Sequence, residues 1–151
     1  MSKNGFTLIE LITTLVILGI ISVFALPRLS GAEAFSVTSA RDAGLSVARQ
    51  VQLRAMQQEE PSHSCFALSI AATRMGGSVS SDTCKLGEDE NRSDVVDLSD
   101  SDVRASGPSS IEYDLLGRPL CGGNSCKITF SQGSASASIC ANSEGYFYAC
   151  D

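Results

Sequence analysis

The sequence predicts an α+β fold in which one long N-terminal helix packs against an antiparallel β-sheet head that contains disulfides. Three features of the 151 residues support this prediction. Residues 6–26 form an apolar run, residues 27–60 continue with small and apolar side chains at helical spacing, and residues 61–151 combine short β-rich runs with all six cysteines. A chain of this length suits one folded domain of ordinary size.

The charge of the chain is unevenly distributed. The sequence contains 11 basic and 17 acidic side chains, for a formal net charge of −6. Residues 1–60 hold the two kinds in equal number, so the whole acidic excess falls on residues 61–151. Affinity for nucleic acid rests on a basic surface, and we therefore expect no nucleic-acid partner.

Residues 6–26 are long and apolar enough to predict a membrane-spanning helix. Such a helix would extend ~31 Å, which matches the hydrocarbon core of a bilayer. A cleaved secretory signal is disfavoured, because the apolar region of such signals is typically about 7 to 15 residues long. A plain membrane anchor remains possible, but Glu10 argues for a further role, since a carboxylate within a membrane helix costs about 3 kcal/mol.

The order of residues at the start of this run is specific. After a short basic leader comes Gly5-Phe6-Thr7-Leu8-Ile9-Glu10-Leu11, and an apolar helix follows with Pro27 near its end. This arrangement resembles the processing signature of type IV prepilins and type II secretion pseudopilins. The resemblance implies a type IV pilin-like fold, removal of the leader 1–5 by prepilin peptidase between Gly5 and Phe6, and N-methylation of Phe6. It also implies that Glu10 and Pro27 serve assembly.

The chemistry of these residues also gives physical reasons for the implied roles, and these reasons do not depend on the resemblance. Gly5 leaves an unhindered peptide bond for a protease that works at the membrane face. Glu10 would lie one turn into the helix, where the positive end of the helix dipole favours an anion. In a filament, the Phe6 ammonium of one subunit could neutralise Glu10 of a neighbour, so a charge that is expensive in isolation would set the register between subunits.

Residues 27–60 are expected to continue as an amphipathic helix. Small or apolar residues recur at spacings of three or four: Ala40, Gly44, Val47, Val51 and Ala55. Pro27 and Gly31 mark where the helix would bend or loosen, and Pro61 would end it. By the same resemblance, the apolar face of this helix packs on the β-sheet of the head.

Residues 61–151 are expected to form strands and turns. Short β-rich or alternating runs occur at Phe66–Ile70, Ile111–Leu116, Lys127–Ser131, Ser136–Cys140 and Tyr146–Cys150. Turn signals separate them: Gly76-Gly77, Gly117-Arg118-Pro119, Gly122-Gly123-Asn124, Gln132-Gly133 and Ser143-Glu144-Gly145. Sequential strands joined by short turns must be antiparallel, so the last three runs predict a meander.

Two of these segments point to one subgroup of the family. The strand and turn Ile111–Pro119, which ends in Tyr-Asp-Leu-Leu-Gly-Arg-Pro, and the closing segment Ile139–Tyr148, which contains Gly145-Tyr146, are similar to segments of the H-type minor pilins and pseudopilins, the FimT and GspH group. With Arg41–Arg49 in the helix, this similarity covers both stem and head.

The cysteines are expected to form disulfides, because they are even in number and confined to a small segment that would face an oxidising compartment. They are Cys65, Cys84, Cys121, Cys126, Cys140 and Cys150. About fifteen pairings are possible for six cysteines, and we predict that neighbours in the sequence pair: Cys65 with Cys84, Cys121 with Cys126, and Cys140 with Cys150. A zinc site is disfavoured, because paired Cys-x-x-Cys knuckles are missing and His63 is the single histidine.

An acid-rich stretch lies before the Ile111 run. It contains Glu88, Asp89, Glu90, Asp94, Asp97, Asp100 and Asp102. Such oxygen ligands could hold calcium, but an ordered Asp-x-Asp-x-Asp-Gly array is missing, and a solvated loop is the favoured interpretation. We expect no metal and no cofactor. The sequence also lacks Gly-x-Ser-x-Gly, His-Glu-x-x-His and P-loop patterns, which predicts that the protein is not an enzyme.

The sequence therefore predicts a structural subunit of a type IV pilus-like fibre. The expected partners are other pilin subunits, prepilin peptidase, the inner-membrane assembly platform and membrane lipid. The precursor would cross the bacterial inner membrane once with a periplasmic head, residues 61–151, and would reach the pilus at the cell surface after assembly. An H-type minor pseudopilin of type II secretion, a tip adhesin and a DNA-uptake pilin remain alternatives, the last weakened by the acidic head.

Overall fold

The computed structural model describes residues 7–57, 67–78, 92–121 and 126–150, with the side chains of residues 23–30 left aside. Within these ranges the elements are one helix followed by nine strands, so the fold is α+β. The chain divides into two compact units, Met1–Glu33 and Ala34–Asp151.

Helix α1 spans Leu8–Met56 and contributes to both units. It begins after Thr7, whose backbone carbonyl accepts hydrogen bonds from the N–H groups of Glu10 and Leu11. The helical assignment continues through Pro27 and Gly31 without interruption, although the sequence predicted loosening there. The last predicted helical residues, 58–60, lie outside the described residues.

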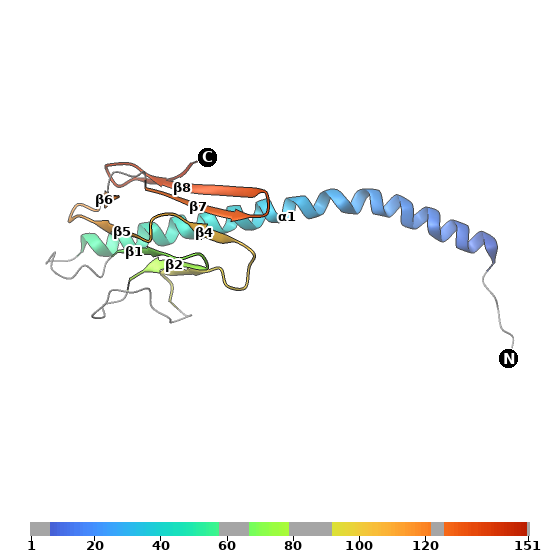
Figure 1. The fold of residues 1–151 in the computed structure, drawn as a ribbon, viewed down its shortest axis with the longest axis horizontal. Coiled ribbons are helices and arrows are strands. Elements are labelled where there is room, and N and C mark those ends of the chain that lie inside the picture. The colour runs from blue at the N-terminus through green and yellow to red at the C-terminus, as the bar shows by residue number, and fades with distance from the viewer. Residues whose placement is uncertain (1–6, 58–66, 79–91, 122–125, 151) are drawn as a thin grey trace. The chain divides into compact units, whose positions relative to one another are not determined.

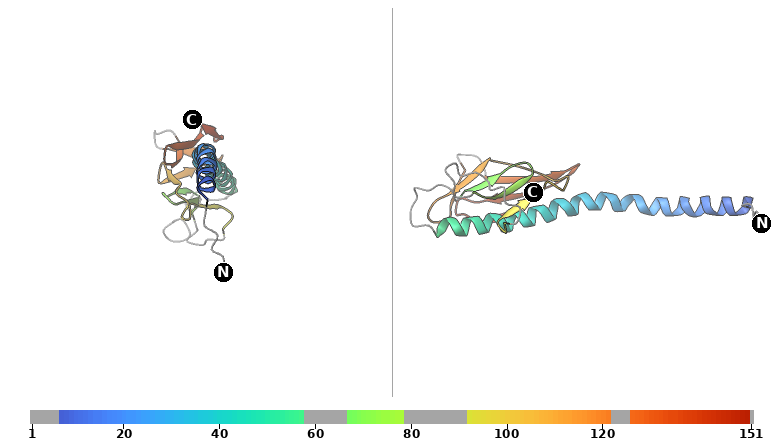
Figure 2. Two further views of the ribbon diagram at one scale, coloured as in Figure 1. Left: turned by 90° about the vertical axis from the view of Figure 1, so that its right-hand side faces the viewer. Right: turned by 90° about the horizontal axis from the view of Figure 1, so that it is seen from below.

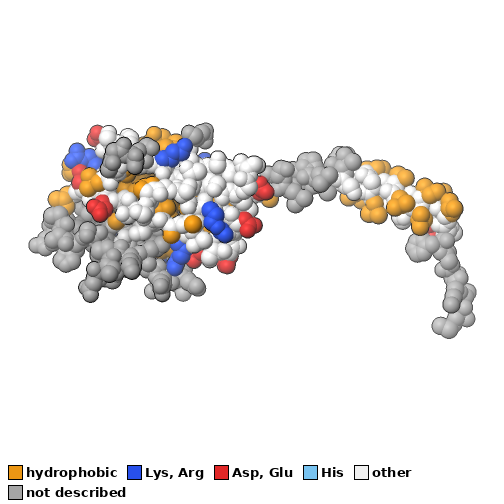
Figure 3. All heavy atoms as spheres, in the orientation of Figure 1, with side chains coloured by type: hydrophobic (Ala, Val, Ile, Leu, Met, Phe, Trp, Pro, Cys, Tyr) orange, Lys and Arg blue, Asp and Glu red, His pale blue; other side chains and the backbone are white. Residues whose placement is uncertain are grey.

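In the first unit, every described side chain from Thr7 to Ser22 is exposed. Most of them are large and apolar, and Figure 3 shows them as orange side chains along this part of α1. None of the helical structure in the described part of the chain is both long and apolar enough to cross a membrane.

The strands of the second unit form two antiparallel sheets, where the sequence predicted a single one (Figure 1). The first sheet has the order β3-β2-β1-β5-β6, formed by Val95–Asp97, Arg74–Gly77, Leu68–Ile70, Ser110–Tyr113 and Pro119–Leu120. The second has the order β4-β7-β8-β9, formed by Arg104–Ser106, Cys126–Gln132, Ala135–Ala141 and Phe147–Cys150. The predicted meander of the last three strands is confirmed, with Ile128 opposite Ile139 and Ile139 opposite Ala149.

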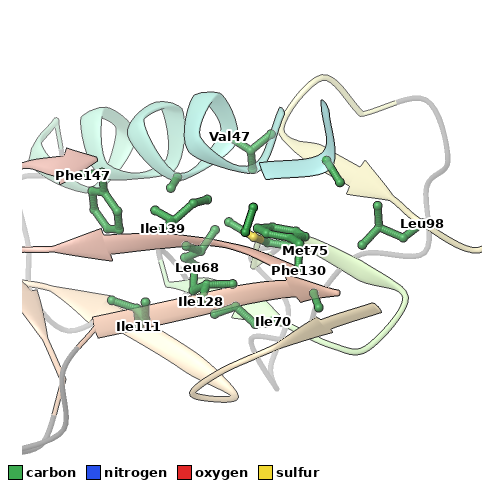
Figure 4. Close-up of a cluster of buried hydrophobic side chains, with 14 of the residues drawn as sticks. Val47, Leu68, Ile70, Met75, Leu98, Ile111, Ile128, Phe130, Ile139 and Phe147 are labelled. Carbon is green, nitrogen blue, oxygen red and sulfur yellow. The ribbon is translucent and has the colours of Figure 1, made fainter. Parts of the chain in front are cut away.

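The core of the second unit lies where α1 meets both sheets (Figures 2 and 4). The face of α1 that the sequence predicted as apolar is buried, including Val47 and Val51. It packs with Leu68 and Ile111 of the first sheet and with the strands of the second. A Cβ at Gly44 would lie 2.7 Å from the ring of Phe130, so this glycine lets β7 approach the helix closely.

Gly76 and Gly77 were predicted to form a turn and instead lie in strand β2. A Cβ at Gly76 would lie 2.6 Å from the carbonyl oxygen of Asp94, and one at Gly77 would lie 2.7 Å from Oδ2 of Asp94. These glycines are therefore needed for close packing within a strand, because a side chain would displace β3.

Three other predicted glycine turns are confirmed at Gly117, Gly133 and Gly145, which have φ of 78°, 56° and 92°. The predicted strand over Ile111–Leu116 ends early, because Asp114 to Gly117 form a hydrogen-bonded turn in which the Gly117 N–H donates to the carbonyl of Asp114. Strands β3, β4 and β6 were not predicted.

Two of the predicted disulfides are formed, Cys121–Cys126 and Cys140–Cys150, with Cα atoms 5.6 and 5.7 Å apart. The second joins neighbouring strands β8 and β9. The predicted pair Cys65–Cys84 lies outside the described residues, as does His63. The short Cys121–Cys126 loop and the C-terminal strand are thereby each tied to the second sheet.

Candidate functional site

The first candidate site is the N-terminal turn of α1, next to the predicted processing point. Gly5 and Phe6 lie outside the described residues. Glu10 is in the first turn of α1 and is exposed, and its backbone N–H donates to Oγ1 of Thr7 at 3.3 Å. Its carboxylate makes no hydrogen bond or ion pair with any described residue.

The hydroxyl groups of the same stretch are satisfied within the helix. Thr13 donates to the carbonyl of Glu10 at 3.0 Å, Thr14 to that of Leu11 at 2.9 Å, and Ser22 to that of Leu18 at 2.7 Å. Such bonds let hydroxyls lie in apolar surroundings without external partners. The Glu10 carboxylate therefore differs from the other polar side chains of residues 7–22, because no described residue hydrogen-bonds to it or neutralises its charge.

The described side chains around Glu10 are exposed. Apolar side chains lie on all sides of α1 in this stretch, as Leu8, Ile9, Ile17 and Leu18 show by their spacing around the helix. A helix that is apolar all round is stable when a membrane or neighbouring helices surround it. Pro27, the other residue expected to serve assembly, lies within α1.

A second arrangement brings together the two segments that resembled H-type pilins. The amide Nε2 of Gln52 in α1 donates to the carbonyl oxygens of Gly117 and Gly145, both at 2.7 Å. Gly117 lies in the turn between β5 and β6 of the first sheet, and Gly145 lies in the turn before β9 of the second. One side chain thus links α1 to both sheets, and we call Gln52, Gly117 and Gly145 the glycine clamp.

Neighbouring contacts support the glycine clamp. Arg49 in α1 donates to the carbonyl of Phe147 at 2.8 Å, and its guanidinium lies 5.8 Å from the ring centre of Tyr146. In the other turn, Asp114 accepts hydrogen bonds from the backbone N–H groups of Leu116 and Arg118 and from Nε of Arg118. The bonds from Arg118 hold the pKa of Asp114 below its usual value.

A third arrangement centres on Asp94, which the sequence placed in a solvated loop. That prediction is wrong for Asp94, which is only 3% exposed. Its carboxylate accepts hydrogen bonds from Arg92 at 2.7 and 3.0 Å and from Arg54 of α1 at 2.5 Å. Arg92 also donates to the carbonyl of Gly77 in β2. The acidic stretch therefore contains an ion pair that connects the end of α1 to the first sheet.

The two arginines set the titration of Asp94. Burial raises the pKa of its carboxyl group, but the hydrogen bond and charge of Arg92 and the charge of Arg54 outweigh this effect, so the pKa lies below the ordinary aspartate value. Across the described ranges, no group of three or more His, Cys, Asp or Glu side chains is arranged to hold a metal ion.

Comparison with known protein families agrees with the first candidate site. Residues 1–26 match the family model described as the prokaryotic N-terminal methylation motif. This motif is the N-terminal signal of type IV pilins and pseudopilins, so the chain carries a pilin-type signal over its first 26 residues. No curated protein and no solved structure matches the chain.

Sequence reasoning missed the residues that organise the head. Nothing in the local sequence indicates the atoms that Gln52, Arg49 and Arg54 bind. A usable signal existed for Gln52, since it follows Val51 and therefore flanks the buried face. Asp94 had no such signal, because its partners lie two and forty positions away along the chain.

Proposed function

We propose that this chain is a structural, type IV pilin-like subunit that is inserted in a membrane as a precursor and then built into a fibre. One observation carries the proposal: an exposed, apolar helical stretch from Leu8 to Ile21 presents the carboxylate of Glu10, which pairs with no described residue. The match of residues 1–26 to the N-terminal methylation motif supports it.

The proposed maturation creates a partner for the carboxylate of Glu10. Prepilin peptidase hydrolyses the Gly5–Phe6 bond, which leaves a new ammonium on Phe6, and the same enzyme methylates it. In the fibre, the ammonium of one subunit pairs with the Glu10 carboxylate of a neighbour. Both charges then leave water together, which is far less costly than burying either one alone.

The proposed location follows from the same segment. Before assembly, residues 6–26 hold the precursor in the bacterial inner membrane and the head lies in the periplasm, where disulfides such as Cys140–Cys150 persist. Other pilin subunits, the inner-membrane assembly platform and membrane lipid are its partners. After assembly the subunit lies in a pilus at the cell surface and contributes to its assembly and to adhesion.

Within this class we propose an H-type minor pilin, nearest to the minor pilin C of the mannose-sensitive haemagglutinin (MSHA) pilus. The six cysteines and the Ala25-Leu26-Pro27-Arg28 junction support the narrower assignment. The convergence of Gly117 and Gly145 on Gln52 gives the two H-type segments a shared structural purpose. The alternative within the class is the H-type minor pseudopilin of type II secretion.

Substitution of Glu10 tests the proposal. Glu10→Leu removes the unpaired charge but leaves the peptide bond after Gly5 and the apolar run, so we expect normal cleavage and a loss of most incorporation into sheared fibres, measured by immunoblot. Glu33→Leu, at an acidic residue of the same helix beyond the apolar run, is the control and should incorporate normally. Incorporation of Glu10→Leu at the wild-type level would contradict the proposed pairing.

A deletion strain separates the two members of the class. Loss of surface fibres with normal export of secreted enzymes supports a pilus subunit, and the reverse result supports a pseudopilin of type II secretion. A strain that retains both would contradict an essential role in either assembly.

A further inference from the structure

Two methionines lie in the described part of the chain, and they differ in their exposure. Met56 is the last residue of α1 and is 45% exposed, whereas Met75 in β2 is 0% exposed. The oxidation of a thioether by a peroxide depends on access from solvent. Peroxide dissolved in water therefore meets Met56 directly, but it reaches Met75 only when the core opens.

The side chain of Met56 packs against the turn at Gly117. A Cβ built at Gly117 would lie 2.6 Å from Sδ and 2.9 Å from Cγ of Met56. The thioether therefore fills the space next to a glycine whose φ is 78°. An apolar, polarisable sulfur suits this contact, because it is at most a weak hydrogen-bond acceptor.

The same space borders the glycine clamp. Gln52 precedes Met56 by four residues, the spacing that brings two side chains together on one face of a helix. Cγ of Gln52 would also lie 3.3 Å from the Cβ built at Gly117. The amide nitrogen of Gln52 has two N–H donors, and its two bonds go to the carbonyls of Gly117 and Gly145. A strong acceptor placed on Met56 would therefore bind Gln52 at the expense of one of these carbonyls.

We propose that Met56 is an oxidation site through which peroxides weaken the glycine clamp. In the reaction, the sulfur lone pair attacks one oxygen of hydrogen peroxide, the O–O bond breaks, an S=O bond forms, and proton transfer releases water. The thioether is oxidised by two electrons and the peroxide is reduced by two. The product is a polar sulfoxide, and its oxygen competes with the Gly117 carbonyl for the amide of Gln52. This effect arises within the second unit and does not depend on the proposed function.

The test treats the full chain in mild detergent with hydrogen peroxide and follows two quantities over time. Peptide mass spectrometry measures the oxidised fraction of each methionine, with Met1 in a peptide of its own. Hydrogen exchange measures the protection of the Gly117 N–H, which donates to the carbonyl of Asp114 at 2.9 Å. The paired strands β7 and β8 serve as the internal reference for exchange.

Two variants isolate the contribution of Met56. Met56→Leu keeps an apolar side chain of similar volume but has no sulfur to oxidise. Met56→Gln places a polar group with an acceptor oxygen at the same position without any peroxide. Met75 of the wild-type chain is the matched control for a methionine that is shielded from peroxide.

We expect Met56 to oxidise about ten-fold faster than Met75, or faster still. Oxidation of Met56 should speed exchange at Gly117 about five-fold, the factor that corresponds to ~1 kcal/mol of lost hydrogen bonding, and should leave β7 and β8 unchanged. Untreated Met56→Gln should show the same faster exchange. Met56→Leu should keep wild-type exchange before and after treatment.

Each part of the proposal has an outcome that overturns it. Equal oxidation rates of Met56 and Met75 would remove the basis for a selective site. Wild-type exchange at Gly117 after Met56 is oxidised would overturn the link to the glycine clamp, and wild-type exchange in Met56→Gln would overturn the competition for Gln52. Faster exchange in peroxide-treated Met56→Leu would assign the effect to another residue.

Discussion

Gly145 shows how a single residue can be required by backbone conformation and by space together. Its φ of 92° lies in a region that L-residues rarely adopt. A Cβ at this position would also lie 2.7 Å from Nε2 of Gln52 and 2.7 Å from the carbonyl oxygen of Gly117. Any side chain would therefore strain the turn and push apart the glycine clamp.

We expect Gly145→Ala to lower the free energy of unfolding by about 2 to 3 kcal/mol, from backbone strain and the lost contacts of the glycine clamp. Urea unfolding of the full chain in mild detergent, followed by near-ultraviolet circular dichroism, measures this change. Gly31→Ala is the control, because Gly31 is helical and, apart from its chain neighbours and the adjacent helix backbone, nothing lies within 4 Å of a Cβ there. Equal stability of the two variants would contradict the steric role of Gly145.

Asp94 shows that a buried charge can support a fold when its partners surround it. Arg92 and Arg54 lower its pKa below the ordinary aspartate value of about 3.9. Because the unfolded chain takes up this proton at higher pH than the folded chain, the stabilisation is fully present above about pH 3.9 and is lost as pH falls through the lower, folded pKa.

We expect Asp94→Asn to lower the free energy of unfolding by about 2 kcal/mol at pH 7, since two arginines lose their carboxylate. The difference between wild type and variant should shrink as the pH falls below about 3.9. Urea titrations between neutral and acid pH measure this difference, with the exposed Asp100→Asn as control. A difference that stays constant to the lowest pH would argue against the ion pair as its source.

At the scale of elements, helix α1 is held to the two sheets by its apolar face and by polar contacts at its flanks. The apolar face supplies Val47, Ala48 and Val51 to the shared core. Gln52 then binds one turn from each sheet, and Arg54 reaches Asp94. The polar contacts fix how the second sheet lies against the first, which apolar burial alone does not specify.

We expect Gln52→Leu to cost about 2 kcal/mol of unfolding free energy, because the carbonyls of Gly117 and Gly145 both lose their donor. Gln52→Glu should cost at least as much, since it replaces the donor with an acceptor. Gln57→Leu makes the same chemical change at an exposed position and should be nearly neutral. Thermal unfolding monitored by circular dichroism compares the three, and a neutral Gln52→Leu would contradict the linking role.

The elements differed in how well the sequence predicted them. The spacing from Ala40 to Ala55 predicted the buried face of α1, and the alternating runs predicted β7, β8 and β9, because both signals are local. Strands β3, β4 and β6 have three, three and two residues, too few for a recognisable alternation. The Gly-Gly pair at 76 and 77 predicted a turn. Its actual role, which is to leave room for Asp94 against strand β2, depends on contacts that form only in the folded protein.

At the scale of the whole molecule, the chain consists of two units that differ in how far their apolar side chains are buried. The second unit, Ala34–Asp151, contains every residue of the hydrophobic core, from Val37 to Phe147, and the described disulfides. The first unit, Met1–Glu33, leaves its described apolar side chains exposed. The second unit should therefore fold without the molecules that cover the N-terminal part of α1.

We expect residues 34–151 alone to fold into a soluble monomer, because the core and the contacts of Gln52 and Asp94 all lie within this range. Dispersed amide resonances and one cooperative unfolding transition would demonstrate folding. The full chain should need detergent or a membrane to remain monomeric, since its apolar stretch stays uncovered otherwise. A fragment that aggregates or shows a collapsed amide spectrum would contradict this division.

The sequence by itself determined the α+β class, the long helix with its buried face, the closing meander, the turns at Gly117, Gly133 and Gly145, and the N-terminal signal around Glu10. These features depend on residue order and periodicity over a few turns or strands, which a local pattern records. The tertiary structure alone decided that two sheets form, that Asp94 is buried between Arg92 and Arg54, and that Gln52 joins Gly117 to Gly145. Each of these depends on at least one partner far away in the chain, such as Arg54 for Asp94, and the positions of these partners are set only when the packed core brings them together.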